Sequence, residues 1–377
     1  MKISINLNRF LQIGMFILLA ILLLNFFFVY DLEKSLNAKI AEAKEFARPA
    51  KIEIIKIESS CKDCFDADAV IKNLKSSGLE ITGEKSLSRN SQDALKLIKQ
   101  YKIEKLPNII LKGEINKTTI QDFKQVDDVL VFDAVLPPYE NAATKKIMGK
   151  VSSVIIKDKS CKVCTDFNLA LQNLKQNGVF IGKEENLDFS ESKAKELIDK
   201  FAIKRLPALL LSSDIEAYPD IALSLSQLKS KDSSYYIIES QAPYVEADSG
   251  KLRGLAKLTF INDSSCSKCY DVKIHRLILS RFGIAVDKEN EVDVNSAEGK
   301  QLASKYSIKN VPTIVLTGDL DVYENFKIVW GQVGTVENDG AYVFREIDAL
   351  GEGIVYMDTS TNEIKIVEPT PKPTGQE

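Results

Sequence analysis

The six cysteines of this chain form three pairs, and two residues separate the members of each pair. The pairs are Cys61-Lys-Asp-Cys64, Cys161-Lys-Val-Cys164 and Cys266-Ser-Lys-Cys269. A thiolate can attack the disulfide of a partner protein, and a second nearby thiol then resolves the mixed disulfide that forms. Cysteine pairs that converge can instead bind Zn²⁺ or Cu⁺. The spacing alone therefore leaves both thiol–disulfide exchange and metal binding open.

A longer pattern surrounds each pair and repeats without a change in spacing. Each first cysteine is followed after 17 residues by a glycine and after 46 residues by a proline. The prolines end a motif of the form Tyr/Phe-x-Ile-x-x-Leu/Val-Pro, and an apolar run follows each of them. The glycines are Gly78, Gly178 and Gly283, and the prolines are Pro107, Pro207 and Pro312. An internal repeat of this length indicates three tandem copies of one domain.

The same secondary structure is expected in each copy. Strands rich in β-branched residues are predicted just before the pairs, at residues 52–57, 154–156 and 258–261. A helix with an apolar stripe follows each pair, and the glycine is expected to end it in a left-handed conformation. A second helix, such as residues 190–201, precedes the proline. Polar turn residues then predict strand–turn–strand connectors at residues 139–151, 244–256 and 356–368.

This order of elements, with Cys-x-x-Cys and the proline at a fixed offset, resembles the thioredoxin superfamily. The resemblance implies an α/β fold: three tandem thioredoxin-like α/β sandwich domains, preceded by one transmembrane helix. We expect residues 1–31 to form a short tail and the transmembrane helix, and residues 32–49 a helical linker. Repeats 1, 2 and 3 are then residues 50–148, 149–253 and 254–367, and residues 368–377 are a disordered tail.

The resemblance also implies roles for site residues. Cys61, Cys161 and Cys266 would be nucleophiles, and Cys64, Cys164 and Cys269 the resolving thiols. Each pair would lie in the first turn of its helix, whose positive end favours a thiolate. The prolines would be cis and lie beside the pairs, and the backbone before them would pair with an extended substrate, at Leu106-Pro107, Leu206-Pro207 and Val311-Pro312. The redox-active disulfides Cys61–Cys64, Cys161–Cys164 and Cys266–Cys269 would need no added cofactor, and no metal site is expected.

Several residues depart from the familiar family pattern. Serines precede the first cysteines, and Ile55, Ile155 and Phe260 stand where the family often has a buried acid. Acids occur three residues before each pair, and they are expected to be solvated loop charges rather than proton relays: Glu58, Asp158 and Asp263. Lys62, Lys162 and Lys268, within the pairs, are expected to be solvated. His275 is expected to be a half-buried helix residue, and Trp330 a packing residue.

The segment from residue 10 to residue 30 contains no charged residue. A helix of this length spans roughly the 30 Å apolar core of a bilayer. A cleaved signal peptide would have a shorter apolar region with a small-residue cleavage site just after it, whereas aromatic residues follow here. We therefore expect an uncleaved single-pass anchor, with a cytoplasmic N-terminus and extracytoplasmic repeats.

The net charge bears on one class of partner, and the Cys pairs leave three functions open. A net charge of −3 gives no basic surface for nucleic acid, so no nucleic-acid partner is expected. The favoured function is a membrane-anchored thiol–disulfide oxidoreductase or isomerase, whose partners are protein dithiols and disulfides and a membrane or extracytoplasmic redox partner. The alternatives are a peptide-binding scaffold with inert disulfides and, less favoured, a Zn- or Cu-binding protein.

Overall fold

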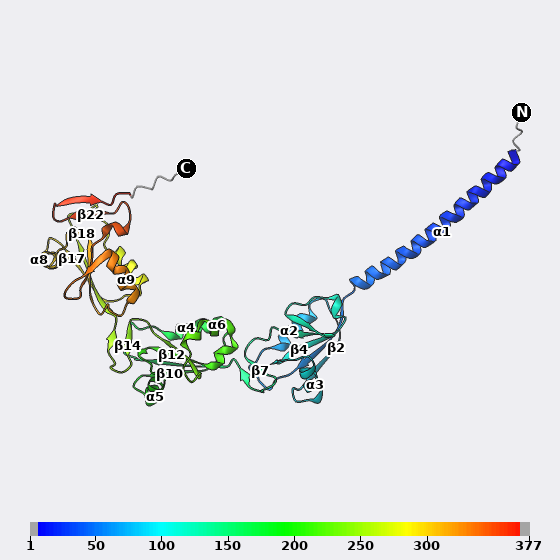
Figure 1. Cartoon of the computed structure of the whole chain (residues 1–377), viewed down its shortest axis with the longest axis horizontal. Helices are drawn as coiled ribbons and strands as arrows, with labels where there is room; N and C mark the ends of the chain where they lie inside the picture. Colours follow the sequence, from blue (N-terminus) through cyan, green and yellow to red (C-terminus); the bar gives the residue numbers. More distant parts are fainter. Residues whose placement is uncertain (1–6, 370–377) are drawn as a thin grey trace. The chain divides into compact units, whose positions relative to one another are not determined.

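The computed structural model describes residues 7–369, and the chain divides into two compact units, residues 1–148 and 149–377. The first unit contains the N-terminal helix and repeat 1, and the second contains repeats 2 and 3 (Figure 1). Residues 1–6 of the predicted N-terminal tail and residues 370–377 of the predicted disordered tail lie outside the described residues.

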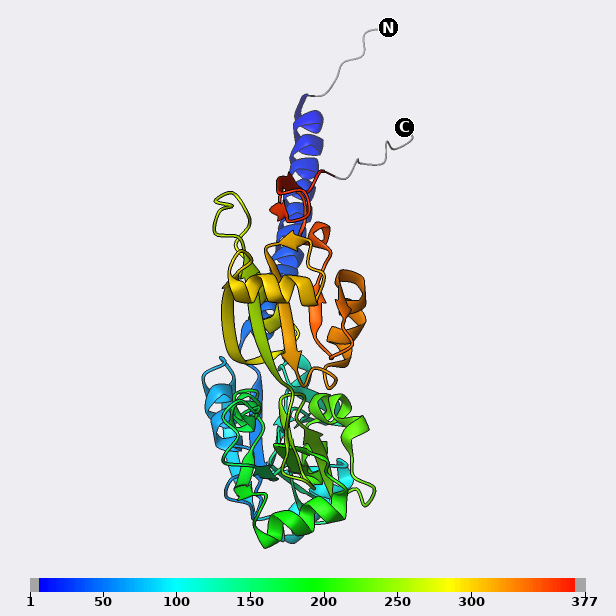
Figure 2. The same cartoon turned by 90° about the vertical axis from the view of Figure 1, so that its left-hand side faces the viewer.

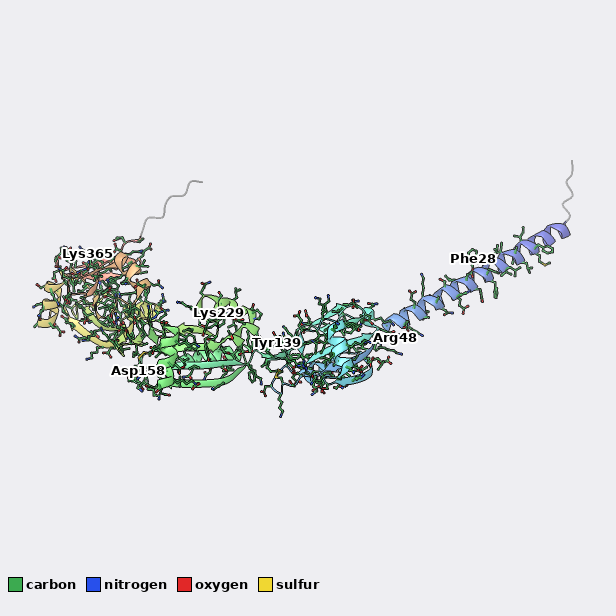
Figure 3. All side chains as sticks on the ribbon, turned by 60° about the horizontal axis from the view of Figure 1, so that its bottom comes forward. Phe28, Arg48, Tyr139, Asp158, Lys229 and Lys365 are labelled. Atoms are coloured by element: carbon green, nitrogen blue, oxygen red, sulfur yellow. A yellow bond between two sulfur atoms is a disulfide. The ribbon has the colours of Figure 1, made fainter. Side chains whose placement is uncertain are left out.

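Helix α1 (Leu7–Ala47) is one continuous helix in two views a quarter turn apart (Figures 1 and 2). It joins the predicted membrane segment to the predicted helical linker without a break. Its span Gly14–Glu45 is long and apolar enough to cross a membrane, although a signal sequence would pass the same test. The large apolar side chains described in it, Phe28 among them, project away from the helix without packing partners (Figure 3).

Repeat 1 is built on a five-stranded sheet of order β2-β1-β4-β6-β5. Strands β1 and β2 are parallel, and β4, β6 and β5 add antiparallel to β1 and to one another. The strands are β1 (Lys51–Ile57), β2 (Glu80–Leu87), β4 (Asn108–Gly113), β5 (Phe123–Val126) and β6 (Val129–Phe132). The helices are α2 (Ala67–Lys75), α3 (Gln92–Gln100) and the short η1 (Ile115–Lys117). A second sheet joins β3 (Lys105–Leu106), β7 (Tyr139–Asn141) and β8 (Ile147–Met148).

Repeat 2 has the same plan with one strand fewer. Its main sheet has the order β10-β9-β12-β13, with β9 and β10 parallel. Its strands are β9 (Val151–Lys157), β10 (Ile181–Asp188), β12 (Ala208–Ser212) and β13 (Tyr235–Glu239). Its helices are α4 (Phe167–Gln176), α5 (Ser192–Phe201), α6 (Pro219–Ser224), η2 (Ser213–Ala217) and η3 (Ser226–Leu228). The small sheet contains β11 (Arg205–Leu206), β14 (Tyr244–Glu246) and β15 (Leu252–Arg253).

The main sheet of repeat 3 has five strands, in the order β17-β16-β19-β21-β20. These are β16 (Leu255–Asn262), β17 (Ala285–Asp293), β19 (Thr313–Gly318), β20 (Gly334–Val336) and β21 (Tyr342–Phe344). The helices are α7 (Ile274–Arg281), α8 (Ala297–Lys305), α9 (Glu324–Val333) and η4 (Ile347–Leu350). The small sheet contains β18 (Asn310–Val311), β22 (Val355–Asp358) and β23 (Glu363–Ile366). Trp330 of α9 is 4% exposed in an apolar core, which confirms it as a packing residue.

Each main sheet is covered on both faces, because its first strand sends alternate side chains to opposite sides. In β1, Ile52 and Ile54 enter one apolar core with α2, while Ile55 and Ile57 enter another with residues of α3. Ile155 and Phe260 are likewise buried, as Ile55 is. The connectors predicted after each proline are the hairpins β7–β8, β14–β15 and β22–β23, which confirms that prediction.

Candidate active site

Each Cys pair is joined by a disulfide, and no free cysteine occurs among the described residues. The Cα atoms of the paired cysteines are 5.5 Å apart in repeat 1, 5.7 Å in repeat 2 and 5.4 Å in repeat 3. We call these disulfides sites 1, 2 and 3, in the order of the repeats. The cysteines of sites 1 and 2 are partly exposed.

The disulfides lie in turns before the helices, so the prediction that they occupy a first helical turn is wrong. Helix α2 begins at Ala67, three residues after Cys64. The backbone amides at its start bind the carboxylate of Asp66, which accepts from Asp68 N at 3.0 Å and from Ala69 N at 3.1 Å. A carboxylate cap, not a thiolate, therefore meets the positive end of this helix.

The same aspartate recurs two residues after each second cysteine. Asp166 caps α4 and accepts from Asn168 N at 3.0 Å, and this bond holds the pKa of Asp166 below its ordinary value. Asp271 accepts from Lys273 N at 2.9 Å in the turn that precedes α7. These three aspartates were not predicted from the sequence, although a capping residue before an apolar helical stretch is a readable signal.

The predicted prolines lie beside sites 1 and 2. Pro107 lines a cleft of about 400 Å³ with Cys61 and Cys64. Pro207 lines a cleft of about 290 Å³ with Cys161 and Cys164. The peptide bonds Leu106–Pro107, Leu206–Pro207 and Val311–Pro312 are cis. Leu106, Leu206 and Val311 are fully buried, and their backbones belong to the small sheets through β3, β11 and β18.

Site 3 is more enclosed than the other two. Cys266 is 7% exposed and packs in an apolar cluster that includes Val311 and Met357. Tyr270, the residue after Cys269, donates its hydroxyl hydrogen to the carbonyl oxygen of Pro312 at 2.7 Å. The proline of site 3 is therefore connected to the cysteine turn by a direct hydrogen bond.

His275 is 3% exposed, so the prediction of a half-buried residue is corrected to a fully buried one. Its Nε2 lies 3.1 Å from the Tyr270 hydroxyl, and its ring packs edge-on against Phe344. Burial away from water lowers the pKa of His275 to about 4, because the apolar surroundings disfavour the charged imidazole. Burial also raises the pKa of Tyr270. The histidine is therefore buried between Tyr270 and Phe344.

The turn before each first cysteine is held by an acid, but not by the same acid in every repeat. Ser160 N donates to Asp158 Oδ1 at 2.7 Å, and Ser265 N donates to Asp263 Oδ1 at 2.9 Å. Asp263 is 8% exposed, so its expected role as a solvated charge is corrected to that of a buried turn residue. In repeat 1, Glu58 is exposed, and Ser60 N instead donates to Glu140 Oε2 at 2.9 Å.

Each cysteine pair belongs to its own repeat. Among residues 7–369, no group of three or more His, Cys, Asp or Glu side chains is placed to hold a metal ion. Sites 1 and 2 belong to different compact units, and sites 2 and 3 belong to different sheets of the second unit.

Several solved structures resemble this chain at low sequence identity. ERdj5 in its crystal form II is 13% identical, with 76% of this chain and 39% of that chain covered and a TM-score of 0.14. The zinc-bound form of human ERp44 is 11% identical over 75% of this chain and 86% of its own, with a TM-score of 0.14. A protein disulfide oxidoreductase from Aeropyrum pernix is 15% identical, with 48% of this chain and 82% of that chain covered and a TM-score of 0.13.

This chain therefore spans about two fifths of the length of the ERdj5 structure. No family model and no curated protein matches the sequence. The fold is established by the strand order of each main sheet, its parallel first pair and the Cys turn between strand and helix. All three repeats have the thioredoxin-like fold that their motif predicts.

Proposed function

We propose that this chain is a thiol–disulfide oxidoreductase that exchanges disulfides with partner proteins at three sites. The observation that carries the proposal is the cleft at site 1, where Cys61, Cys64 and Pro107 line one surface. Site 2 repeats this arrangement in a second cleft. A scaffold with inert disulfides would not need the same pair beside the same proline in every copy.

At site 1 the exchange begins from the dithiol form. The Cys61 thiolate attacks one sulfur of a substrate disulfide, so that the substrate S–S bond breaks and a mixed disulfide forms. The other substrate sulfur leaves as a thiolate and takes a proton from water. The Cys64 thiolate then attacks the Cys61 sulfur, which restores the Cys61–Cys64 disulfide and releases the second substrate thiol. Two electrons pass from the protein to the substrate, and the reverse sequence oxidises a substrate dithiol.

The test uses the full chain in detergent micelles with a self-quenched, disulfide-linked peptide and glutathione as the reductant. We expect acceleration over glutathione alone, and trapped mixed disulfides when a second cysteine is replaced, as in Cys64→Ala, Cys164→Ala and Cys269→Ala. The matched control replaces the three first cysteines with serine and should capture nothing. If the wild-type chain has six titratable thiols after reduction but does not accelerate peptide reduction, it is a scaffold with inert disulfides instead. If the purified chain carries stoichiometric zinc, the Cys pairs form a metal site.

We also propose that α1 is an uncleaved anchor with the repeats outside the cytoplasm. Its exposed apolar length supports this, since such a surface is stable in lipid and not in water. In a chain whose six cysteines are replaced by serine, Thr361→Cys in the last hairpin should react with a membrane-impermeant maleimide on intact cells. Ser4→Cys should react only after lysis. Labelling of Ser4→Cys alone on intact cells would indicate the opposite orientation. A mature chain that begins after residue 30 would contradict the proposal of an uncleaved anchor.

A further inference from the structure

A buried ion pair lies beside site 1 and has no counterpart at the other two sites. Glu140 is fully buried and Arg89 is 5% exposed, and their side chains form a salt bridge. Arg89 Nη2 also donates to the carbonyl oxygen of Ala142 at 3.5 Å. Arg89 Nε has no hydrogen-bond partner among the described residues. Burying two charges in this way costs desolvation free energy, which makes the pair a poor stabilising element by itself.

Repeats 2 and 3 carry apolar residues at both positions. Arg89 follows Cys61 by 28 residues, and Phe189 and Val294 follow their own first cysteines by the same interval. Glu140 pairs with Leu106 across β3 and β7, where Val245 pairs with Leu206 and Met357 with Val311. In repeats 2 and 3 these apolar residues belong to the clusters against which the cysteines pack. The same fold therefore forms with an apolar pair at these two positions.

Glu140 connects the two halves of site 1. Its backbone pairs with Leu106, the residue before Pro107. Its Oε2 accepts hydrogen bonds from Ser59 Oγ at 2.6 Å, from Ser60 N at 2.9 Å and from Ser60 Oγ at 3.1 Å. Ser59 Oγ in turn accepts from Cys61 N at 3.0 Å. One carboxylate thus joins the proline strand to the backbone of the first cysteine.

We propose that Glu140, with Arg89 as its counter-charge, is a positioning residue that gives site 1 a thiol–disulfide equilibrium distinct from those of sites 2 and 3. The proposal deepens the proposed function, on which it rests. In repeats 2 and 3 the equivalent turn is held by Asp158 or Asp263, each from the same turn. In repeat 1 the turn depends on a charge from a distant strand, and a change in that charge reaches the backbone of Cys61 through Ser59.

The sign of each single change follows from electrostatics. Reduction of site 1 by glutathione breaks the Cys61–Cys64 bond, consumes two glutathione thiols, forms one glutathione disulfide and leaves two protein thiols. A nearby positive charge stabilises the thiolate of the reduced site, and a negative charge destabilises it. Glu140→Gln leaves Arg89 unbalanced and should favour the reduced form. Arg89→Met leaves Glu140 unbalanced and should favour the disulfide, so the two variants shift the equilibrium in opposite directions.

The experiment equilibrates the full chain in micelles with glutathione buffers at pH 7 and measures each site by differential alkylation and mass spectrometry. The charged groups around the cleft, Lys56, Glu58, Lys62, Asp66 and Asp68, are the same in every variant. We expect opposite shifts of the site 1 equilibrium constant, of about tenfold each, for Glu140→Gln and Arg89→Met. The double variant Arg89→Phe/Glu140→Val carries the residues of repeat 2 and is expected to fold, with site 1 moved toward the equilibrium constant of site 2.

Sites 2 and 3 in the same molecules are internal controls and should not change. Amide hydrogen exchange in β4 reports whether repeat 1 remains folded, and only variants that keep wild-type protection are compared. The proposal would be overturned if the site 1 equilibrium constant shifted in the same direction in both single variants. It would also be overturned if that constant were unchanged in the folded double variant. The equilibrium with glutathione involves no protein substrate, so this result is independent of whether the chain exchanges disulfides with other proteins.

Discussion

Tyr270 donates a hydrogen bond of 2.7 Å to the carbonyl oxygen of Pro312, and so joins the cysteine turn of site 3 to its proline strand. In repeat 1 the equivalent residue is Phe65, which has no hydroxyl, and Glu140 makes the connection instead. Repeat 2 has Thr165 at this position. Repeats 1 and 3 therefore share a fold but join the two halves of their sites by different side chains.

Removal of this hydroxyl should weaken repeat 3. Tyr270→Phe keeps the aromatic ring and leaves the Pro312 carbonyl without its donor, which should lower the free energy of unfolding by about 1 to 2 kcal/mol. Trp330 is the only tryptophan in the chain and lies in the core of repeat 3, so its fluorescence follows the unfolding of that repeat. The measurement is a urea titration of Trp330 fluorescence, with Tyr356→Phe as the control. An unchanged urea midpoint would contradict the prediction.

His275 should make repeat 3 sensitive to mild acid. Its pKa is about 4 in the folded chain, below the ordinary value of 6.5, so the unfolded chain binds the proton more tightly between these values. The stability that neutral His275 contributes is complete above pH 6.5 and is lost as the pH falls toward 4. The loss should be on the order of 3 kcal/mol.

The comparison variant is His275→Val, because repeat 1 has Val70 at this position. Urea midpoints from Trp330 fluorescence should fall between pH 6.5 and pH 4 in the wild type more steeply than in the variant. The groups that face the imidazole are the Tyr270 hydroxyl and the Phe344 ring, and neither changes its charge in this range. Equal slopes for the two proteins would show that another group is responsible.

The spacing of cysteines and prolines predicted most of the fold, because both sit at fixed positions between regular elements. The position of the disulfides was predicted incorrectly, since two cysteines three residues apart fit a tight turn as well as a helical turn. Asp66, which caps α2, was the signal that the helix begins later. Its recurrence as Asp166 could have located the start of α4 in the same way.

The buried pair beside site 1 was harder to predict. Arg89 and Glu140 are far apart in the sequence, and each resembles an ordinary surface charge when it is considered alone. An alignment of the three hairpins gives the missing signal, because Glu140 stands where the other copies have Val245 and Met357. A charge at a position that is apolar in sister repeats indicates either exposure or a buried partner, and only the structure decides between them.

The aspartate caps predict a local loss of stability. Asp166→Ala removes the acceptor for Asn168 N, which should cost about 1 kcal/mol and increase hydrogen exchange in the first turn of α4. Asp166→Asn keeps an oxygen acceptor and should stay close to the wild type. Because the pKa of Asp166 is lowered in the folded chain, its contribution is present above its ordinary value of 3.8 and is lost as the pH falls through the folded value. Equal rates of hydrogen exchange in Asp166→Ala and Asp166→Asn would contradict a role of Asp166 as the cap of α4.

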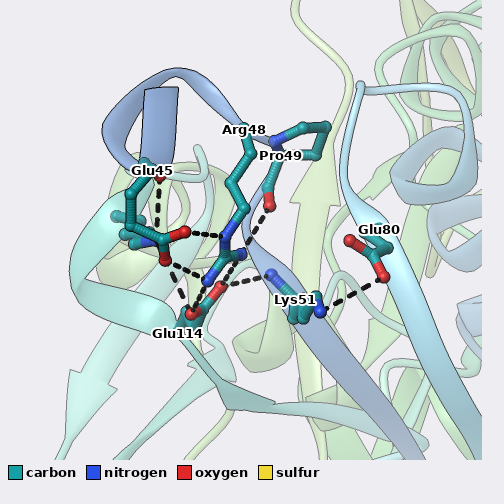
Figure 4. A network of polar contacts seen from close by, with 7 residues as sticks. Glu45, Arg48, Pro49, Lys51, Glu80 and Glu114 are labelled. Atoms are coloured by element: carbon teal, nitrogen blue, oxygen red, sulfur yellow. Dashed lines mark hydrogen bonds and ion pairs between the residues drawn. The ribbon is translucent and has the colours of Figure 1, made fainter. Parts of the chain in front are cut away.

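Arg253 connects repeat 2 to repeat 3, and its replacement provides the last prediction. Its guanidinium binds Glu246 of its own hairpin and Asp319 of repeat 3, and Gly254 N donates to the same Asp319 at 3.0 Å. Figure 4 shows the equivalent arrangement at the start of repeat 1, where Arg48 lies between Glu45 of α1 and Glu114. Arg48 and Arg253 both stand 13 residues before a first cysteine, and Met148 is the residue at this position before site 2.

Arg253→Met should therefore lower the free energy of unfolding of repeat 3 by about 1 to 2 kcal/mol, seen as a lower urea midpoint, because Asp319 keeps its charge in a partly buried place without its partner. Lys251→Met is the matched control, since it removes the same charge from an exposed position in the same hairpin. Hydrogen bonds from Arg253 hold the pKa of Asp319 below its ordinary value of 3.8. The difference between wild type and Arg253→Met should thus be complete above pH 3.8 and shrink as the pH falls and Asp319 takes up a proton. If Lys251→Met lowered the urea midpoint as much as Arg253→Met, the effect would come from the change in net charge and not from the ion pair between Arg253 and Asp319.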